Sequence, residues 1–301
     1  MAGLPYAGHS RQGRKGGSIS TNDTPKTDVS IPLGRLEEGI LADRPNRFLA
    51  VVDLAGRAIK AHVPDSGRLR ELLFPGNRVM VRKAASPTRK TSYDLVLAAS
   101  GGTESGGEAS GGIWVCVDTR YPNRIFEQGV KQRALDAFRE YTSVRREVRL
   151  EQALTQALER TEDAVVDGKA KASEAPTRAS KTPKSRFDFL LEGPGKRPLL
   201  IEVKSVTLSV DGTGLFPDAP TLRGARHVSE MKEALSRGLD ACVAFIAQRQ
   251  DVIRVSAHRQ MDPKFAQALD EATRAGVKVH AYRCEVTPAH IRLESAEVPY
   301  R

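Results

Sequence analysis

The sequence predicts a mixed α/β chain in which an N-terminal OB-like small β-barrel precedes a C-terminal α/β domain. Five short strand-like segments follow one another over about 75 residues near the start of the chain, a pattern typical of a small barrel such as an OB-fold. Beyond residue 120, strand patterns alternate with helical patterns, which favours a sheet covered by helices. A length of 301 residues suits two domains.

The barrel is predicted over residues 39–119. Its first two strands flank Leu54-Ala55-Gly56-Arg57, which is typical of a hairpin turn, and Pro75-Gly76 marks the turn before the third strand. The predicted strands are 48–53, 58–63, 78–83, 93–98 and 113–117. We interpret residues 100–112, rich in Gly, Ser and Glu, as a flexible insertion, and residues 1–38, rich in Gly, Ser, Thr and Pro, as a disordered arm.

The α/β domain is predicted over residues 120–301. Apolar residues recur at helical spacing in three segments, and Gly238 and Gly276 end the second and third of them. The predicted helices are 123–141, 228–237 and 263–275, and the predicted strands are 144–150, 187–191, 199–207, 241–247 and 277–282. The fourth of these strands is almost wholly apolar, as expected for a buried strand. We interpret the polar residues 160–184 as a second disordered insertion.

Composition excludes several classes of protein. No apolar stretch approaches the ~20 residues of a membrane-spanning helix, so no membrane partner is expected. Cys116, Cys242 and Cys284 are scattered and form neither a CxxC metal pair nor a disulfide framework, which predicts a cytoplasmic protein. Because only 5% of residues are aromatic, stacking on bases is not expected to dominate any binding of nucleic acid.

The formal net charge is +10, and the excess is concentrated in the predicted barrel. Between Arg44 and Lys90, eleven basic and three acidic residues give a local charge of +8, whereas from Ser185 to Glu230 six basic residues balance six acidic ones. Two interpretations stay open. The basic segment is either a module that binds a polyanion such as DNA, placed before a metal-binding module, or a solvated surface rich in arginine.

Three charged side chains are expected to converge where two apolar strands pair. Glu202 and Lys204 are two residues apart in one predicted strand and therefore point to the same face. Asp188, in the preceding strand, lies beside Glu202 if the two strands form a hairpin. Two carboxylates suit Mg²⁺ or Mn²⁺, and a lysine beside the metal can orient a water molecule and offset phosphate charge. The pattern predicts a metal site at Asp188 and Glu202, with Lys204 as a third catalytic residue.

The simpler interpretation is a pair of strands with ordinary outward-facing charges, because a lone E-x-K triplet is common. Both strands are otherwise strongly apolar, however. An isolated charge in such a strand is costly unless it is paired or bound to a metal. The spacing between Asp188 and Glu202, one hairpin apart, also suits a shared site.

The arrangement of Asp188 and Glu202-Val203-Lys204 resembles the PD-(D/E)XK nuclease superfamily. Further motifs resemble the sugar fermentation stimulation protein A family over about residues 40–298. They are Arg47-Phe48-Leu49-Ala50, His62-Val63-Pro64-Asp65-Ser66-Gly67-Arg68, Pro87-Thr88-Arg89-Lys90, Val117-Asp118-Thr119-Arg120-Tyr121-Pro122-Asn123, Ser185-Arg186-Phe187-Asp188-Phe189, Ile201-Glu202-Val203-Lys204-Ser205-Val206-Thr207-Leu208, Phe216-Pro217-Asp218-Ala219-Pro220-Thr221-Leu222-Arg223-Gly224-Ala225-Arg226-His227 and Gly276-Val277-Lys278-Val279. Departures from the family pattern at Asp65-Ser66, Asp118 and Arg226 leave the catalytic carboxylates intact.

In the nuclease superfamily, an acid from the preceding helix often joins the metal site. Glu127, on the helix expected at 123–141, is the candidate here, and an ordinary surface charge is the alternative. Glu147 is a further candidate, but it stands beside two arginines on a predicted strand. A structural ion pair explains Glu147 equally well.

The resemblance implies an OB-like N-terminal domain, a nuclease-like C-terminal domain, sequence-nonspecific DNA binding and a regulatory link to sugar metabolism. Three hypotheses follow. The first is an enzyme that uses Mg²⁺ or Mn²⁺ to hydrolyse DNA phosphodiester bonds. The second is a DNA-binding regulator of sugar metabolism genes that keeps the nuclease fold without cutting. The third is an enzyme that acts on RNA or on a nucleotide. An intact Asp-Glu-Lys set favours an enzyme.

Basic residues in both predicted domains are candidate DNA ligands. Gly224 permits close backbone approach in a loop that should open on the metal face, although its arginines can instead pair with Asp211 or Asp218. In one interpretation, the turn at 62–68 offers backbone N–H groups to a phosphate. In the other, Asp65 is a plain N-cap. The candidate ligands are Arg68, Arg82, Lys83, Arg89, Lys90, Arg223, Arg226 and His227.

Overall fold

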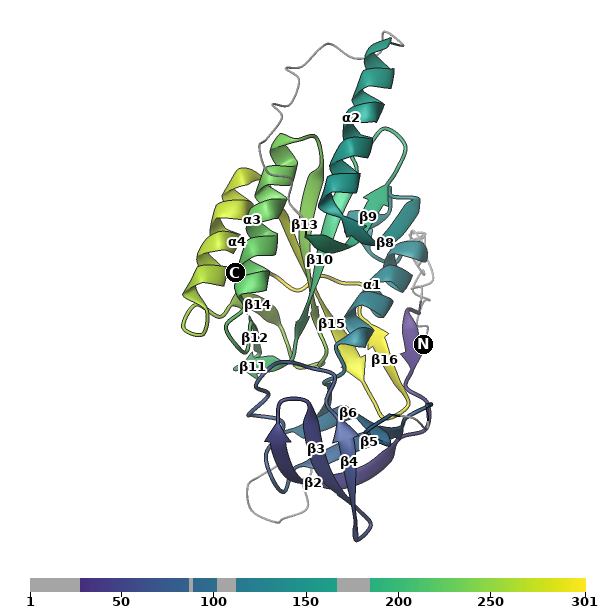
Figure 1. Ribbon diagram of the computed structural model, residues 1–301, viewed down its shortest axis with the longest axis vertical. Coiled ribbons are helices and arrows are strands. Elements are labelled where there is room, and N and C mark those ends of the chain that lie inside the picture. Colours follow the sequence, from purple (N-terminus) through teal and green to yellow (C-terminus); the bar gives the residue numbers. More distant parts are fainter. Residues whose placement is uncertain (1–27, 87–88, 102–111, 167–184) are drawn as a thin grey trace, which may run out of the picture.

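The computed structural model describes residues 28–86, 89–101, 112–166 and 185–301 of the chain. It consists of a closed β-barrel and a larger sheet with helices on both faces, which confirms the predicted mixed α/β class with an OB-like barrel. Figure 1 shows the barrel at one end of the molecule and the large sheet above it. Within the described ranges, no helix is both long and apolar enough to cross a membrane.

Six strands form the sheet of the barrel. They are β2 Glu37–Asn46, β3 Leu49–Leu54, β4 Arg57–His62, β5 Arg78–Lys83, β6 Tyr93–Ser100 and β7 Ile113–Cys116. Their order is β4-β3-β2-β5-β6-β7, and a parallel pairing between β4 and β6 closes the five strands β2 to β6 into a barrel, with β7 added alongside β6. Ala55 and Gly56 adopt positive φ angles in the turn between β3 and β4, as a two-residue hairpin turn matched to the strand twist requires. Inward-facing residues such as Val52 and Leu95 form the barrel core.

Part of the expected disordered arm is folded. Strand β1, Ser30–Pro32, pairs antiparallel with β16, His290–Leu293, at the edge of the large sheet. Every second residue around β1 is buried, at Val29, Ile31 and Leu33. This alternation is that of a strand, but it spans too few residues to stand out in a polar segment. The expectation of disorder over residues 1–38 is therefore wrong for residues 28–38, and residues 1–27 lie outside the described residues.

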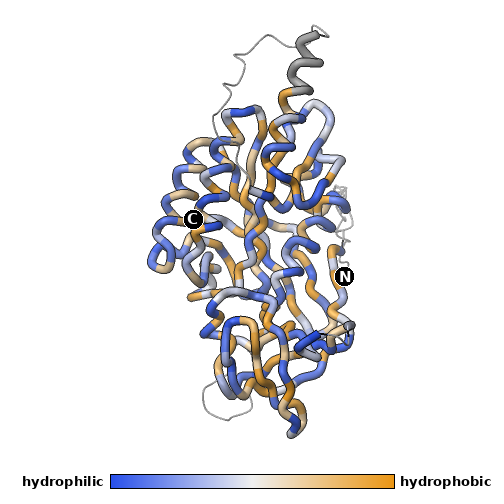
Figure 2. The backbone as a smooth tube through the Cα atoms, in the orientation of Figure 1, coloured by the Kyte–Doolittle hydropathy of each residue, from blue (hydrophilic) through white to orange (hydrophobic). Residues whose placement is uncertain are grey.

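The large sheet has a parallel centre. Its further strands are β8 Ser143–Arg149, β9 Arg186–Glu192, β10 Leu199–Val206, β13 Asp240–Ala247 and β15 Lys278–Val286. The strand order is β1-β16-β15-β13-β10-β9-β8, and β13 pairs in parallel with both β10 and β15. The central strands are largely hydrophobic (Figure 2), because both of their faces are covered. A smaller sheet contains β11 Leu208–Val210, β12 Thr213–Phe216 and β14 Arg254–Ala257.

Helices cover the two faces of the large sheet. They are α1 Arg120–Lys131, α2 Leu150–Val166, α3 Leu222–Ser236 and α4 Pro263–Ala275, with a 3₁₀ turn at Asp136–Phe138. Helix α1 buries its apolar residues against one face, and α2, α3 and α4 bury theirs against the other. Alternate residues of β10 therefore enter different cores, so that Ile201 faces the α1 side and Leu200 the α3 side.

Two helix boundaries differ from the prediction, and one helix was not predicted. The helix expected over 123–141 ends at Lys131, because Arg133 adopts a positive φ and the chain turns there. Helix α3 begins in the segment expected to be a loop, where the Thr221 side chain caps it by accepting the Gly224 N–H. The helix that was not predicted is α2, which continues to Val166 inside the expected insertion at 160–184. Residues 167–184, and residues 102–111 of the other expected insertion, lie outside the described residues.

A shared core and a charge network join the barrel to the large sheet. Met80 and Leu97 of the barrel belong to the same hydrophobic core as Tyr121 of α1. Beside this core, Asp94 and Asp118 are buried carboxylates. They form ion pairs with three guanidinium groups, those of Arg82, Arg89 and Arg120. The relative placement of the barrel and the sheet thus depends on buried apolar and ionic contacts together.

We expect Asp118→Asn to lower the free energy of unfolding by about 2 kcal/mol, because it weakens the charged hydrogen bonds of a buried carboxylate, although Arg82 and Arg120 keep Asp94 as a partner. Urea unfolding followed by circular dichroism measures the change. Glu38→Gln is the matched control, because Glu38 forms an exposed pair with Arg78. Its loss should cost less than about 1 kcal/mol. Equal effects of the two substitutions would contradict the role assigned to the network.

Candidate metal and active site

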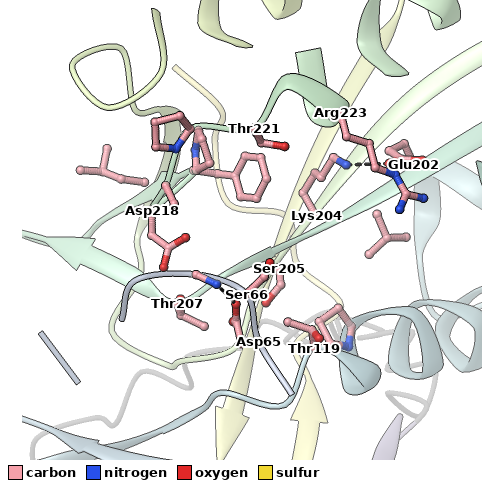
Figure 3. Close-up of a pocket in the computed structure, with 18 of the residues that line it drawn as sticks. Asp65, Ser66, Thr119, Glu202, Lys204, Ser205, Thr207, Asp218, Thr221 and Arg223 are labelled. Carbon is pink, nitrogen blue, oxygen red and sulfur yellow. Dashed lines mark hydrogen bonds and ion pairs between the residues drawn. The ribbon is translucent and has the colours of Figure 1, made fainter. Parts of the chain in front are cut away.

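A cavity of about 450 Å³ lies where the barrel meets the large sheet. We call it the central cavity. Barrel residues 65–67 line one side, and residues of β10, of the loop after β12 and of the start of α3 line the others. Figure 3 shows Glu202, Lys204 and Arg223 grouped together, apart from Asp65 and Asp218. The three residues predicted to carry chemistry, Asp188, Glu202 and Lys204, all line this cavity.

The pairing of β9 with β10 ends just before the predicted carboxylates. The last paired residues are Phe189 and Ile201. At this point the backbone N–H of Val203 donates to Asp188 Oδ2 at 2.8 Å. The Asn123 side chain of α1 donates to Asp188 Oδ1 from its Nδ2, also at 2.8 Å. Asp188 is thus held by one donor from β10 and one from α1.

Glu202 is buried on the face of β10 that is covered by α3. Lys204 Nζ donates to Glu202 Oε1 at 2.6 Å, and the ring nitrogen Nδ1 of His227 lies 2.8 Å from the same oxygen. Lys204 and Glu202 point to one face of the strand, as their spacing predicts. The two carboxylates and the ammonium group therefore meet at one wall of the central cavity.

The two carboxylates have opposite electrostatic surroundings. Burial and the neighbouring charge of Glu202 raise the pKa of Asp188 to about 6. Burial also acts to raise the pKa of Glu202, but Lys204 and His227 outweigh it and hold that pKa below its usual range. A cation between the two groups would relieve their repulsion.

The donor set fits a hard divalent cation. Among the described residues, no group of three or more His, Cys, Asp or Glu side chains is placed to hold a metal ion, so a zinc site with four protein ligands does not fit. Mg²⁺ is typically held by one or two carboxylates and keeps several waters. Asp188 and Glu202 supply that number of carboxylates beside a cavity large enough for water.

Helix α1 contributes an amide to the site in place of the expected acid. Glu127 does not line the central cavity and pairs with Lys131 at 2.8 Å and with Arg146 at 3.6 Å. Asn123, one turn earlier, reaches Asp188. Glu147 forms an ion pair with Arg186 at 2.9 Å, which matches the structural alternative. The predicted metal role of Glu127 is therefore wrong in this structure, and Asn123 was missed because an amide gives no charge signal.

A turn of the barrel forms the wall opposite β10. Asp65 Oδ1 accepts the Gly67 N–H at 2.6 Å, and Asp218, from the loop after β12, accepts the Leu69 N–H at 3.2 Å. A Cβ atom on Gly67 would collide with the Asp218 carboxylate, so a side chain at this position would require Asp218 to move. Arg44 donates to the carbonyls of residues 67 and 68. The Asp218 carboxylate therefore fixes this turn to the loop between β12 and α3.

These contacts bear on the two interpretations of the turn at 62–68. The Gly67 N–H is bonded to the Asp65 carboxylate, the N–H of the following Leu69 to the Asp218 carboxylate, and no helix begins there. These two N–H groups are therefore not available to a phosphate. The Asp65 contact is a local turn hydrogen bond of the kind that an N-cap makes.

The basic residues of the barrel fall into two groups. Arg82 and Arg89 pair with the buried carboxylates that join the barrel to α1, so the structure assigns them a structural role. Lys83 and Lys90 are exposed, and Arg68 is half-buried. The expectation that Arg82 and Arg89 serve as DNA ligands is therefore not met in this structure, because both are engaged in ion pairs. The partner of Arg82, Asp118, is 36 residues away in sequence, whereas that of Arg89, Asp94, is five residues away.

A second cavity, of about 480 Å³, adjoins the first through Arg223, which lines both. Arg186 and Arg226 also line it, and both are exposed. His227 also lines this cavity, but its exposed fraction is only 2%, so it offers little surface to the phosphate ligand that was predicted. Neither Asp211 nor Asp218 forms an ion pair with Arg223 or Arg226 in the described part of the chain.

Comparison with known proteins finds two family models along the chain. The model described as "Sugar fermentation stimulation protein RE domain" matches residues 151–290, and that described as "SfsA N-terminal OB domain" matches residues 42–117. A sugar fermentation stimulation protein homolog of Moorella thermoacetica is 36% identical over 88% of this chain and 96% of its own length. The homolog of Acetivibrio thermocellus is 38% identical over 88% of this chain and 97% of its own length.

A solved structure has the same fold. The SfsA protein of Pyrococcus furiosus in complex with Ca²⁺ matches with a TM-score of 0.66 and 24% identity, over 90% of this chain and 98% of that one. At this level of identity the likeness supports the shared architecture of barrel and sheet.

The electrostatics of the cavity predict a stability change with pH. Burial and the nearby Asp218 raise the pKa of Asp65 from 3.8 to about 6, so the folded protein favours the protonated carboxyl. The stability that this preference contributes is full below about pH 4 and is lost as the pH rises through about 6. Asp65→Asn keeps the acceptor for Gly67 and removes the charge. We expect it to match the parent at about pH 4 and to be more stable by about 2–3 kcal/mol at pH 8.

Urea unfolding at both pH values tests this expectation. Asp53→Asn is the matched control, because the exposed Asp53 accepts the Gly56 N–H in a similar turn contact. Its effect should be the same at both pH values. A gain for Asp65→Asn that does not depend on pH would show that burial of charge is not the cause.

Proposed function

The chain belongs to the sugar fermentation stimulation protein family, and from this premise we propose that it is a sequence-nonspecific DNA-binding protein that hydrolyses phosphodiester bonds with Mg²⁺ or Mn²⁺. The observation that carries the proposal is the convergence of half-buried Asp188 and buried Glu202 with Lys204 on one cavity. The protein would act in the cytoplasm, where its three buried free thiols would stay reduced.

Each residue has a distinct part in the proposed reaction. Asp188 and Glu202 would hold the cation, and a bound divalent cation supplies an activated water and neutralises charge at the scissile phosphate. Lys204, 13% exposed at the cavity wall, would orient a water proton and balance the phosphate charge. The solved Pyrococcus furiosus relative is described as a complex with Ca²⁺, which supports a divalent-cation site in this fold.

The second cavity supports binding of a polyanion beside the metal site. Arg223 lines both cavities, so a strand whose phosphates contact Arg223 and Arg226 would also reach Glu202 and Lys204. Arg47 lines the central cavity from the barrel side. Guanidinium groups contact phosphates without reading the bases, which suits binding with little dependence on sequence.

Substitutions of the three catalytic candidates separate metal binding from chemistry. We expect Glu202→Gln and Asp188→Asn to weaken Mn²⁺ binding by more than 100-fold, since each removes one of two charged ligands. We expect Lys204→Ala to keep Mn²⁺ affinity and to slow hydrolysis by about 10²–10⁴-fold. Titration calorimetry with Mn²⁺ and a cleavage assay on single- and double-stranded DNA and RNA measure the two effects.

Glu147→Gln is the control for this series, because it neutralises an acid that is paired with Arg186 away from the cavity. Unchanged Mn²⁺ binding in both carboxylate variants would place the metal elsewhere. A parent protein that binds Mn²⁺ and DNA but cuts no nucleic acid would instead support a non-catalytic regulator of sugar metabolism genes.

The second cavity predicts how DNA affinity depends on salt. Each phosphate contact on duplex DNA contributes about 0.9 to the slope of log affinity against log salt. We expect the Arg223→Ala/Arg226→Ala variant to reduce the slope by about 1.8, for two contacts. Fluorescence anisotropy in chelator, over a range of salt concentrations, measures the slope.

The matched control is Arg259→Ala/Arg274→Ala, which removes the same charge at another place. Arg259 pairs with the Asp270 side chain of α4, and Arg274 donates to the backbone carbonyl of Asp270. Its slope should equal that of the parent. An equal reduction in the two double variants would mean that only net charge matters.

A further inference from the structure

His227 is a buried histidine that contacts the metal site from behind. It lies in the second turn of α3, with its side chain 2% exposed. Its Nδ1 lies 2.8 Å from Glu202 Oε1, and the Phe187 ring packs against it at 5.1 Å between centroids. His227 lines the second cavity but exposes little of its surface there, and it contacts one of the two carboxylates directly.

The second ring nitrogen fixes the direction of the hydrogen bond. Arg223 Nε lies 3.4 Å from His227 Nε2. A guanidinium group only donates, so Nε2 accepts. The proton of a neutral imidazole must then be on Nδ1, from which it is donated to Glu202. Hydrogen bonds therefore run from Arg223 to His227 and from His227 to Oε1 of Glu202.

We propose that His227 is a positioning residue that holds Oε1 of Glu202, so that Oε2 is presented to the cation. Oε1 already accepts from Lys204 and His227, whereas no hydrogen bond from the described residues reaches Oε2. The inference rests on the proposed function, since it assigns the metal-facing oxygen of the same site. Partners behind a metal ligand commonly fix its orientation in this way.

The start of α3 is anchored firmly enough for this role. The Thr221 N–H donates to Asp262 Oδ2 at 2.7 Å, and Asp262 Oδ1 accepts the Phe265 N–H at 2.9 Å as the cap of α4. A Cβ atom on Gly224 would stand 2.8 Å from the Thr221 side chain and 3.3 Å from Phe265, so the two helices meet closely here. Lys204, in contrast, borders the cavity. Its ammonium group can give up the hydrogen bond to Glu202 and bind a water or a phosphate instead.

The test compares three substitutions of His227 in the full chain. Asn carries an amide nitrogen near the position of Nδ1, Gln carries it farther out near Nε2, and Phe keeps the ring without a donor. We expect Mn²⁺ affinity of His227→Asn within about threefold of the parent. We expect His227→Gln and His227→Phe to bind Mn²⁺ about 10–100-fold more weakly, as loss of a partner behind a metal ligand does. Titration calorimetry with Mn²⁺ measures the affinities.

Two controls separate positioning from folding. His280→Phe removes a similar contact, since His280 Nδ1 lies 3.0 Å from Glu297 outside both cavities. It should leave Mn²⁺ affinity unchanged. The free energy of unfolding of every His227 variant, measured in urea, is the second control. If the phenylalanine variant fails to fold, the comparison of Asn with Gln still tests the donor position.

The outcomes distinguish this inference from the proposed function. A parent that binds no Mn²⁺ overturns the proposed function. A parent that binds Mn²⁺ through Glu202, with equal affinities for the Asn, Gln and Phe variants, overturns the role of His227 alone. Rescue by Asn but not by Gln supports it, because a merely structural role would follow the unfolding free energy instead of the donor position.

Discussion

Two carboxylates held away from water, Asp188 and Glu202, impose the constraint on which the rest of the central cavity depends. Like charges in a buried site repel each other, so each must be compensated by donors or by a cation. Every element around the site supplies a donor. Asn123 comes from α1, the Val203 N–H from β10 itself, and His227 from α3. The site is therefore a property of the packed sheet, because no single segment contains its partners.

The barrel completes this site from the other side. Gly67 lets its turn approach Asp218, and the pairs of Asp118 fix the barrel against α1. A cavity formed between two packed units is a common place for ligand binding, since both units can contribute walls. In this protein the barrel side contributes Arg47 and Asp65, and the sheet side contributes the catalytic candidates. Substrate would thus contact both parts of the chain at once.

Local patterns predicted the reactive set but not its supports. Two-residue spacing and apolar flanks identified Glu202 and Lys204, and one hairpin spacing added Asp188. Five of the barrel-domain strands and α4 followed from turn and cap signals in the same way, but β2 was not predicted. Asn123 and His227 support the carboxylates through contacts 65 and 25 residues apart in sequence, which no local pattern encodes. The role of β1 was missed for a similar reason, since its partner β16 lies at the other end of the chain.

Charge counting overestimated the surface that is free to bind a polyanion. Several cations of the basic segment serve the fold: Arg44 bonds the Gly67 turn, while Arg82 and Arg89 neutralise buried carboxylates. Such charges contribute to the long-range field but are not free to contact phosphates. Arg223 and Arg226 are exposed, although they lie in a segment with no net charge. Arg223 lines both cavities, and Arg226 lines the second, so these two residues border the proposed metal site. Position relative to the carboxylates, more than local net charge, therefore determines which cations can act on a bound strand.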